Sequence, residues 1–454
     1  MKSLIFVCIF VILCTGLRVD LTETFLKAKR ETDIDMAIQQ NKIKTISPEE
    51  LQMIKEGTLS VINYNTSKFD SDNPTVDLIN FKNVQYYGPA VVGSEEQKFL
   101  VVYDTGSSWF WIPKDNCDGC FGQGNRFSTV SSSTYINTQE RITLNYGKGT
   151  AEGYISTDLI GLENSTPGRM TFIPVDVASD MEGSQADGIA GLAPTPSQGA
   201  DLFVDMLVDT NVIDTREFTV FIGQSGTDES FIEFGRNQDD QVNVTFVDLT
   251  PFEGQPQTYW SVILDSLTYG DTVLTLDTYN TVWDTGTSLI GFTRTNLLNI
   301  VTTIANEQKL FVIEGTYYAI ECDDIDRVEN MYFEFDEKTI TVDKNEFVQY
   351  SQGYCIFIMF EIPNGVSSQD FTLLGDSFLR GVKTIHDIEN MRIGIFPQKM
   401  YEYNGSGGGS LLWIYIVMAI VGIAIIILGL VCIFKYLKNY KRTGTNQTTY
   451  QRVK

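Results

Sequence analysis

Short apolar runs follow one another along the chain between about residues 80 and 398. Aromatic and β-branched residues fill these runs, and Gly, Asn, Asp or Pro separate them. Such runs are typical of β-strands, so the pattern predicts a mostly β body. The clearest runs are YYGPAVVG (86–93), KFLVVYD (98–104), RITLNYGKG (141–149), EFTVFIG (217–223), SFIEFG (230–235), TITVDK (339–344), YCIFIMFEIP (354–363) and MRIGIFP (391–397).

Both ends of the chain carry longer apolar stretches. Residues 1–19 are typical of a cleaved secretory signal peptide, with a buried strand or short anchor as the alternative. Residues 411–434 carry no charge and would cross a hydrocarbon layer of ~30 Å as a helix. A Gly- and Ser-rich tether, 401–410, precedes them, and a tail with only basic charges, 435–454, follows. The pattern predicts a single-pass type I membrane protein with a lumenal or extracellular body.

Residues 20–75 differ from the β-rich body. SPEELQMIKEG (47–57) has Ser47 as a helix cap, Pro48 in the first turn and Gly57 as a stop. NTSKFDSDNPT (65–75) has the composition of an exposed linker. A helical leader joined to the body by a linker indicates a removable pro-segment, and a small helical subdomain is the alternative.

Length and charge narrow the class of protein. A chain of 454 residues exceeds the roughly 250–300 residues that one core can hold, so two lobes are expected, 76–252 and 253–400. The formal net charge of -25 argues against nucleic acid as a partner, because such a surface repels phosphates. Carboxylates begin to protonate near about pH 4 to 5, so this surface would repel itself less in an acidic compartment.

Four of the seven cysteines lie in the predicted lumenal body: Cys117, Cys120, Cys322 and Cys355. An even number in an oxidising compartment predicts two disulfides. CDGC (117–120) allows the alternative of a redox-active pair, although no thioredoxin-like βαβ pattern surrounds it. With one histidine in the whole chain, no zinc site is expected, and no cofactor is predicted.

One pattern occurs twice along the chain. VVYDTGSSWFW (101–111) and TVWDTGTSLIG (281–291) each place an Asp-Thr-Gly turn directly after an apolar strand. An apolar element with a Gly follows each turn at nearly the same distance, ADGIAGL (186–192) and TLLGDSF (372–378). We interpret the chain as a tandem duplication of a β-rich lobe, whose pseudo-twofold axis would bring the two turns face to face.

Facing turns would explain why Asp104 and Asp284 tolerate apolar surroundings. Two carboxylates about 3 Å apart can share one proton because both cannot be ionised at once. The aspartic proteases are the known example of this rule. The ionised member then acts as a base toward a water that attacks a carbonyl, and the protonated member stabilises the oxyanion. Support is expected from the rest of the two turns: Thr105, Gly106, Ser107, Thr285, Gly286 and Thr287.

On these motifs, residues 80–398 resemble the pepsin family of aspartic endopeptidases. NVQYYGPAVVGSEEQKFLVVYDTGSSWFWIP (83–113) is similar to the family's first strand and first active-site loop. LLGDSFLRGVKTIHDIENMRIGIFP (373–397) is similar to its C-terminal signature. The resemblance implies a mostly β, bilobal double β-barrel with an active-site cleft between the lobes, and it implies hydrolysis of peptide bonds.

The resemblance also implies roles for individual residues. NYGKGTAEG (145–153) is similar to the family's flap, which would place Tyr146, Gly147 and Gly149 over the substrate and Trp111 beneath the tyrosine. It implies the disulfide pairs Cys117–Cys120 and Cys322–Cys355. The family's pro-segment often sets a basic residue against the catalytic pair, for which the candidates are Lys27, Lys42 and Lys44.

Two positions depart from the family's pattern or fall outside its catalytic residues. Lys148 replaces a small polar residue at the flap tip, which indicates altered subsite preference or a positive charge over the cleft. His386 lies in the C-terminal signature but away from the catalytic positions, so a packing or surface role is expected.

The function predicted is that of a membrane-anchored aspartic endopeptidase, acting as a monomer on protein or peptide substrates. The alternative is a catalytically inactive receptor or inhibitor on the same scaffold. YQRV (450–453) resembles a tyrosine-based sorting signal, and an inert tail is the alternative. The protein is therefore expected either in an endosomal, lysosomal or vacuolar membrane or at the cell surface. The glycosylation candidates on the lumenal side are the Asn-x-Ser/Thr sites Asn65, Asn164, Asn243 and Asn404.

Overall fold

The computed structural model describes residues 43–45, 73–81, 85–122, 124–147, 149–181, 184–223, 230–241, 244–313, 317–362 and 369–396. The predicted signal peptide, almost all of the predicted pro-segment with its helix, the tether, the predicted transmembrane segment and the tail lie outside these residues, as does Lys148. Within the described ranges, no helix is both long and apolar enough to cross a membrane.

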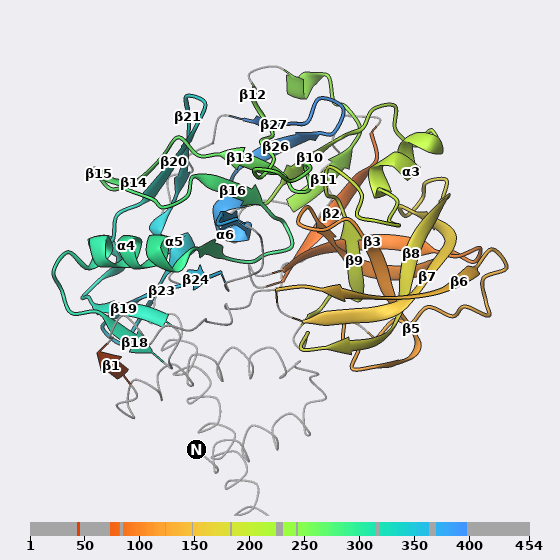
Figure 1. The fold of residues 1–454 in the computed structure, drawn as a ribbon, viewed down its shortest axis with the longest axis horizontal. Helices are drawn as coiled ribbons and strands as arrows, with labels where there is room; N and C mark the ends of the chain where they lie inside the picture. The colour runs from red at the N-terminus through yellow and green to blue at the C-terminus, as the bar shows by residue number, and fades with distance from the viewer. Residues whose placement is uncertain are drawn as a thin grey trace, which may run out of the picture. The chain divides into compact units, whose positions relative to one another are not determined.

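The first predicted lobe is built almost entirely of strands (Figure 1). Strand β1 (Ile43–Thr45) precedes the lobe in the chain. The elements of the lobe are β2 (Thr75–Phe81), β3 (Gln85–Val92), β4 (Gln97–Asp104), β5 (Phe110–Asp118), β6 (Ile136–Asn145), β7 (Thr150–Gly161), β8 (Gly168–Ser179), β9 (Gly188–Gly191), α3 (Phe203–Asp209), β10 (Glu217–Phe221), β11 (Ser230–Phe234), η1 (Asp239–Gln241) and β12 (Thr245–Asp248).

The second predicted lobe has shorter strands and most of the helical residues. Its elements are β13 (Ser261–Ile263), β14 (Ser266–Tyr269), β15 (Thr272–Leu274), β16 (Asn280–Trp283), β17 (Ile290–Phe292), α4 (Arg294–Ala305), β18 (Phe311–Ile313), β19 (Tyr317–Glu321), η2 (Ile325–Arg327), β20 (Met331–Phe335), β21 (Lys338–Val342), α5 (Lys344–Phe347), β22 (Val348–Ser351), β23 (Tyr354–Phe357), β24 (Phe360–Glu361), β25 (Thr372–Leu374), α6 (Asp376–Leu379), β26 (Lys383–Asp387) and β27 (Arg392–Ile395).

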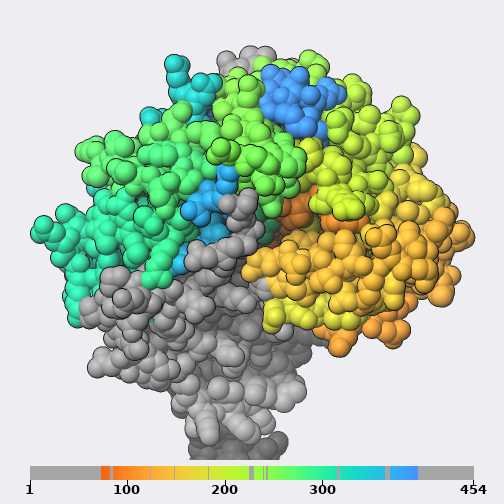
Figure 2. All heavy atoms as spheres, viewed as in Figure 1, coloured from red at the N-terminus to blue at the C-terminus, as the bar shows by residue number. Residues whose placement is uncertain are grey.

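The described strands form four sheets, which confirms the predicted mostly β class. The largest runs in the order β12-β27-β26-β10-β11-β2-β3-β4-β9-β5-β8-β7-β6. The other three have the orders β1-β18-β19-β23-β22, β13-β16-β25-β17-β24 and β15-β14-β20-β21. In Figure 2 the orange-to-yellow atoms of the first lobe and the green-to-cyan atoms of the second gather in separate regions.

The predicted repeat is visible in the strand pairing. In the first half β4, which ends at Asp104, runs parallel to β9, and in the second half β16, which precedes Asp284, runs parallel to β25. Both partner strands bring a glycine against the turn that follows the Asp. A Cβ on Gly191 would lie 2.7 Å from the carbonyl oxygen of Ser107, and one on Gly375 would lie 2.5 Å from that of Leu289. Only glycine fits these close approaches.

The largest sheet contains strands from both predicted lobes. β26 and β27, close to the C-terminal end of the described chain, pair with β10 and β12 of the first lobe, and the blue ribbons lie beside the green ones in Figure 1. His386 on β26 is buried here, with its ring stacked on Phe218 at 4.7 Å and set edge-on to Trp260 at 4.6 Å. The histidine therefore has the packing role that was one of its two expected roles.

The apolar run YCIFIMFEIP does not form one strand. β23 pairs with β19 and β22, whereas β24 pairs with β17 in a different sheet. The chain changes sheet between the two strands, where Ile358 donates its N–H to the carbonyl of Phe347 at 2.8 Å. A nearly continuous apolar run gives no periodic sign of such a change.

Candidate active site

The two Asp-Thr-Gly turns have the same local hydrogen bonds. Gly106 donates its N–H to Asp104 Oδ1 at 2.9 Å, and Gly286 donates to Asp284 Oδ1 at 2.8 Å. The hydroxyl of Ser107 donates to Asp104 Oδ2, and that of Thr287 donates to Asp284 Oδ2 at 2.7 Å. Each carboxyl is therefore held by one backbone and one hydroxyl donor, which fixes its plane.

The turns face each other closely. A Cβ placed on Gly106 would lie 2.5 Å from Asp284 Oδ1, and a Cβ placed on Gly286 would collide with Asp104 Oδ1. The carboxyls are close enough for the charge of Asp284 to act on Asp104. Glycine is needed in both turns because each approaches the carboxyl of the other half.

The two carboxyls differ in their exposure to solvent. Asp104 is buried and Asp284 is partly exposed. Burial, followed by the negative charge of Asp284, raises the pKa of Asp104 well above its usual range, although hydrogen bonds from Ser107 and Gly106 act in the opposite direction. Asp104 therefore keeps its proton at a pH where an isolated carboxyl would have lost it.

The flap is the hairpin of β6 and β7, and its tip carries Tyr146. Tyr146 donates its N–H to the carbonyl of Gly149 at 2.8 Å, which closes the turn. Its hydroxyl accepts from Trp111 Nε1 at 2.8 Å. Removal of the phenol from solvent, together with the charge of Asp104, raises the pKa of Tyr146. A hydrogen bond thus ties the tyrosine of this hairpin to Trp111 on β5.

These observations can be compared with known proteins. A model of the eukaryotic aspartyl protease family matches residues 85–398. The chain belongs to this family. Vacuolar protease A of Aspergillus fumigatus is 29% identical over 339 residues, which cover 73% of this chain and 83% of the relative. Pepsin A of Bos taurus is 28% identical over 337 residues, which cover 70% of this chain and 86% of the relative. Probable vacuolar protease A of Arthroderma benhamiae is 27% identical over 394 residues, which cover 84% of this chain and 94% of the relative.

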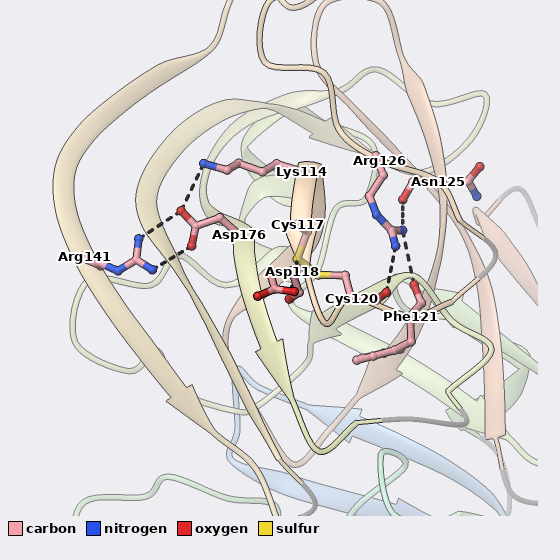
Figure 3. The surroundings of a disulfide bond; sticks show 9 residues. All are labelled: Lys114, Cys117, Asp118, Cys120, Phe121, Asn125, Arg126, Arg141 and Asp176. Atoms are coloured by element: carbon pink, nitrogen blue, oxygen red, sulfur yellow. Dashed lines mark hydrogen bonds and ion pairs between the residues drawn. A yellow bond between two sulfur atoms is a disulfide. The ribbon is translucent and has the colours of Figure 1, made fainter.

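Both disulfides of this aspartyl protease are present and confirm the expected pairs. Cys117 is bonded to Cys120, and Cys322 is bonded to Cys355. Figure 3 shows the guanidinium of Arg126 beside the first disulfide loop, where it donates to three carbonyl groups. The accepting residues are Cys120 at 3.0 Å, Phe121 at 3.4 Å and Asn125 at 2.8 Å. Phe121 sets its ring edge-on to Trp111, so this loop also supports the base of the flap.

The sequence did not single out Asp376, a buried residue near the two carboxyls. It follows Gly375 in TLLGDSF and donates its N–H to the carbonyl of Thr287 at 2.7 Å. Burial raises its pKa well above the usual range, the positive charge of Arg380 acts against this, and the charge of Asp284 adds to it. The repeat drew attention to Gly375, but only the fold shows that the next residue is bonded to the second turn and lies within reach of the charge of Asp284.

The glycosylation candidates are only partly described. Asn164 is exposed in the turn between β7 and β8, with a positive φ of 65° that asparagine adopts more readily than most residues. Asn65, Asn243 and Asn404 lie outside the described residues. Among the described residues, no group of three or more His, Cys, Asp or Glu side chains is arranged to hold a metal ion.

Proposed function

We propose that this aspartyl protease cleaves protein or peptide substrates internally and that Asp104 and Asp284 together supply the acid and the base. The close approach of the two turns carries the proposal, because a Cβ on Gly106 would lie 2.5 Å from Asp284 Oδ1 and the two threonines bond each other across the turns. Their matched donors and the raised pKa of Asp104 support it, because one shared proton makes one carboxyl a base and the other an acid at the same pH.

In the proposed reaction the ionised carboxylate accepts a proton from a water, whose oxygen attacks the carbonyl carbon of the scissile peptide. The protonated carboxyl gives its hydrogen to the carbonyl oxygen, so the tetrahedral intermediate carries no net charge from the attack. As the C–N bond breaks, the carboxyl that took the proton of the water gives it to the amide nitrogen, which leaves as an amine. A hydroxyl of the intermediate gives its proton to the other carboxylate as the new carboxylic acid forms, so the pair is again singly protonated. The flap, with Tyr146 at its tip, covers the substrate during these steps.

We further propose the division of the chain and its location. Residues 1–19 direct secretion, 20–75 form the pro-segment, 76–252 and 253–400 form the two lobes, and 411–434 anchor the protein to a membrane through the tether 401–410. Relatives named vacuolar protease A support an acidic vacuolar or lysosomal location. An anchor raises the effective concentration of substrates on the same membrane.

The test is hydrolysis of an unfolded protein by the processed enzyme, with and without a statine-type inhibitor, across about pH 3 to 7. We expect hydrolysis that the inhibitor blocks, and a loss of activity when the pH is raised far enough to remove the shared proton. The absence of hydrolysis in a correctly processed sample that still binds the inhibitor would favour the inactive receptor instead.

A further inference from the structure

Four charged side chains join the flap to the strands beside it, as Figure 3 shows in part. Arg141 on β6 donates to Asp176 on β8 through Nη1 at 3.1 Å and Nη2 at 2.9 Å. The Nε of Arg141 donates to Glu152 on β7, and Lys114 on β5 donates to Asp176 at 3.2 Å. We call Lys114, Arg141, Glu152 and Asp176 the flap clamp.

A β-bulge places Asp176 in the clamp. Glu152 pairs with Val177 and Gly153 pairs with Val175, so Asp176 is an extra residue in β8 without a partner on β7. A bulge re-aims the side chain of the extra residue. Gly153 allows it, because a Cβ there would lie 2.6 Å from the carbonyl oxygen of Pro174. The bulge thus directs one carboxylate toward cations from strands on both sides.

The clamp lies at the root of the hairpin whose tip carries Tyr146. Arg141 pairs with Tyr154 across the hairpin, and its guanidinium lies 5.1 Å from the centre of the Tyr154 ring. Neighbouring side chains of the same strands, Ile142 and Leu144, pack on the apolar cluster that contains Trp111. The polar clamp and this cluster together hold the hairpin root.

Geometry makes the clamp stronger than an ordinary surface ion pair. The side chain of Asp176 is only 18% exposed and receives a two-pronged bond from Arg141. The pair Lys98–Glu163, near the opposite end of β7, has a lysine that is 70% exposed and contributes little. Although burial alone would raise the pKa of Asp176, bonds from Arg141 and Lys114 outweigh it and lower that pKa, so Asp176 stays ionised to a lower pH than an isolated aspartate.

We propose that Arg141 is a positioning residue, which holds the root of the flap against Asp176 and so favours the position of Tyr146 over the substrate. Only the kinetic consequence of this inference rests on the proposed peptidase function. Loss of the clamp loosens the hairpin and weakens contacts that the flap makes with substrate in both the ground state and the transition state, so KM rises and kcat is little changed.

The experiment compares the full-length protein with Arg141→Gln, Asp176→Asn and the double variant, and uses Lys98→Gln as the matched control. Hydrogen exchange of the hairpin amides and the steady-state kinetics of a peptide substrate are both measured. In either single variant we expect KM to rise about 3–10-fold, kcat to change less than about 2-fold, and the hairpin amides to exchange about 3–10-fold faster. The double variant should be no worse than either single one, and Arg141→Lys should recover part of the loss.

The control and the two readouts separate the possible outcomes. Unchanged exchange and unchanged KM in Arg141→Gln would overturn the proposal, and so would equal effects in Lys98→Gln. A fall in kcat/KM that merely follows a lower melting temperature would also overturn it. If the wild-type protein shows no hydrolysis, the proposed function fails, and the exchange rates alone decide whether the clamp holds the flap.

Discussion

Thr105 and Thr285 hold each other across the two turns of the candidate active site. Each donates its backbone N–H to the hydroxyl of the other, at 3.0 Å in both directions. The hydroxyl of Thr105 donates to the carbonyl of Trp283 at 2.9 Å, and that of Thr285 donates to the carbonyl of Tyr103 at 2.6 Å. Neither turn can shift without breaking bonds to its partner, so this exchange sets the separation of the two carboxyls.

Replacing one of these hydroxyls tests the exchange. Thr105→Val keeps the shape of the side chain but leaves the N–H of Thr285 and the carbonyl of Trp283 buried without their partner. We expect the free energy of unfolding to fall by about 1–3 kcal/mol. Urea unfolding measures this, with exposed Thr302→Val on α4 as the control, which should change stability by less than about 0.5 kcal/mol. Equal effects in the two variants would contradict the assignment.

The hydroxyl of Tyr146 links the flap to Trp111. Tyr146→Phe removes that hydroxyl and leaves Trp111 Nε1 without its acceptor. We expect kcat/KM to fall about 10-fold, and the free energy of unfolding to fall by about 1–3 kcal/mol because the buried Nε1 of Trp111 loses its partner. Steady-state kinetics with a peptide substrate measure the change. An unaltered kcat/KM would show that the hydroxyl has no part in closing the flap.

His386 should make the fold sensitive to acid. Burial lowers its pKa from 6.5 to about 3, and Nδ1 has no hydrogen-bond partner among the described residues. Unfolding lets the imidazole take up a proton, so the contribution of neutral His386 to stability falls as the pH drops below about 6.5 toward 3. His386→Phe removes this pH-dependent loss of stability.

The pH dependence of that variant is the measurement. Relative to wild type, His386→Phe should gain about 3 kcal/mol in free energy of unfolding between pH 7 and pH 4. Urea unfolding at the two pH values gives this difference directly. A gain that is the same at both pH values would reflect packing alone and would contradict the titration of a buried imidazole.

Asn164 is the described glycosylation candidate. It is exposed in a turn, so a glycosyltransferase can reach it. Thr166→Ala removes the acceptor motif without replacing Asn164, and we expect the protein to lose the mass of one glycan on a gel. Asn446→Gln, in the predicted cytoplasmic tail, should leave the mass unchanged. No shift in Thr166→Ala would show that Asn164 is not modified.

The strands and the paired turns could be predicted because their signals are local. Alternating or continuous apolar residues mark β4, and the repeated Asp-Thr-Gly motif marks Asp104 and Asp284 as equivalent positions. The disulfides also followed from the family resemblance. The repeat predicts that the two turns face each other, but it does not give the distance between them. Only the fold shows how closely the turns approach.

Other features depend on contacts that no local pattern shows. Helix α4 was not predicted, because β-branched residues such as Ile300 and Thr303 lower helix propensity. It forms because Thr293 caps it and one face is buried. The clamp residue Asp176 gives no sequence signal, since its direction depends on a bulge between β7 and β8. The pKa of Asp376 is raised in part by the charge of Asp284, which lies in a different sequence motif.

The central claim is that Asp104 and Asp284 act as one unit, and a double-mutant cycle tests it most directly. Asp104→Asn, Asp284→Asn and the double variant are compared in kcat/KM, with folding checked by circular dichroism. We predict that each single change lowers kcat/KM at least about 10³-fold and that the double variant is no worse than either, because a pair that shares one proton fails as a whole. Losses that multiply in the double variant, or a single variant within about 10-fold of wild type, would contradict the account.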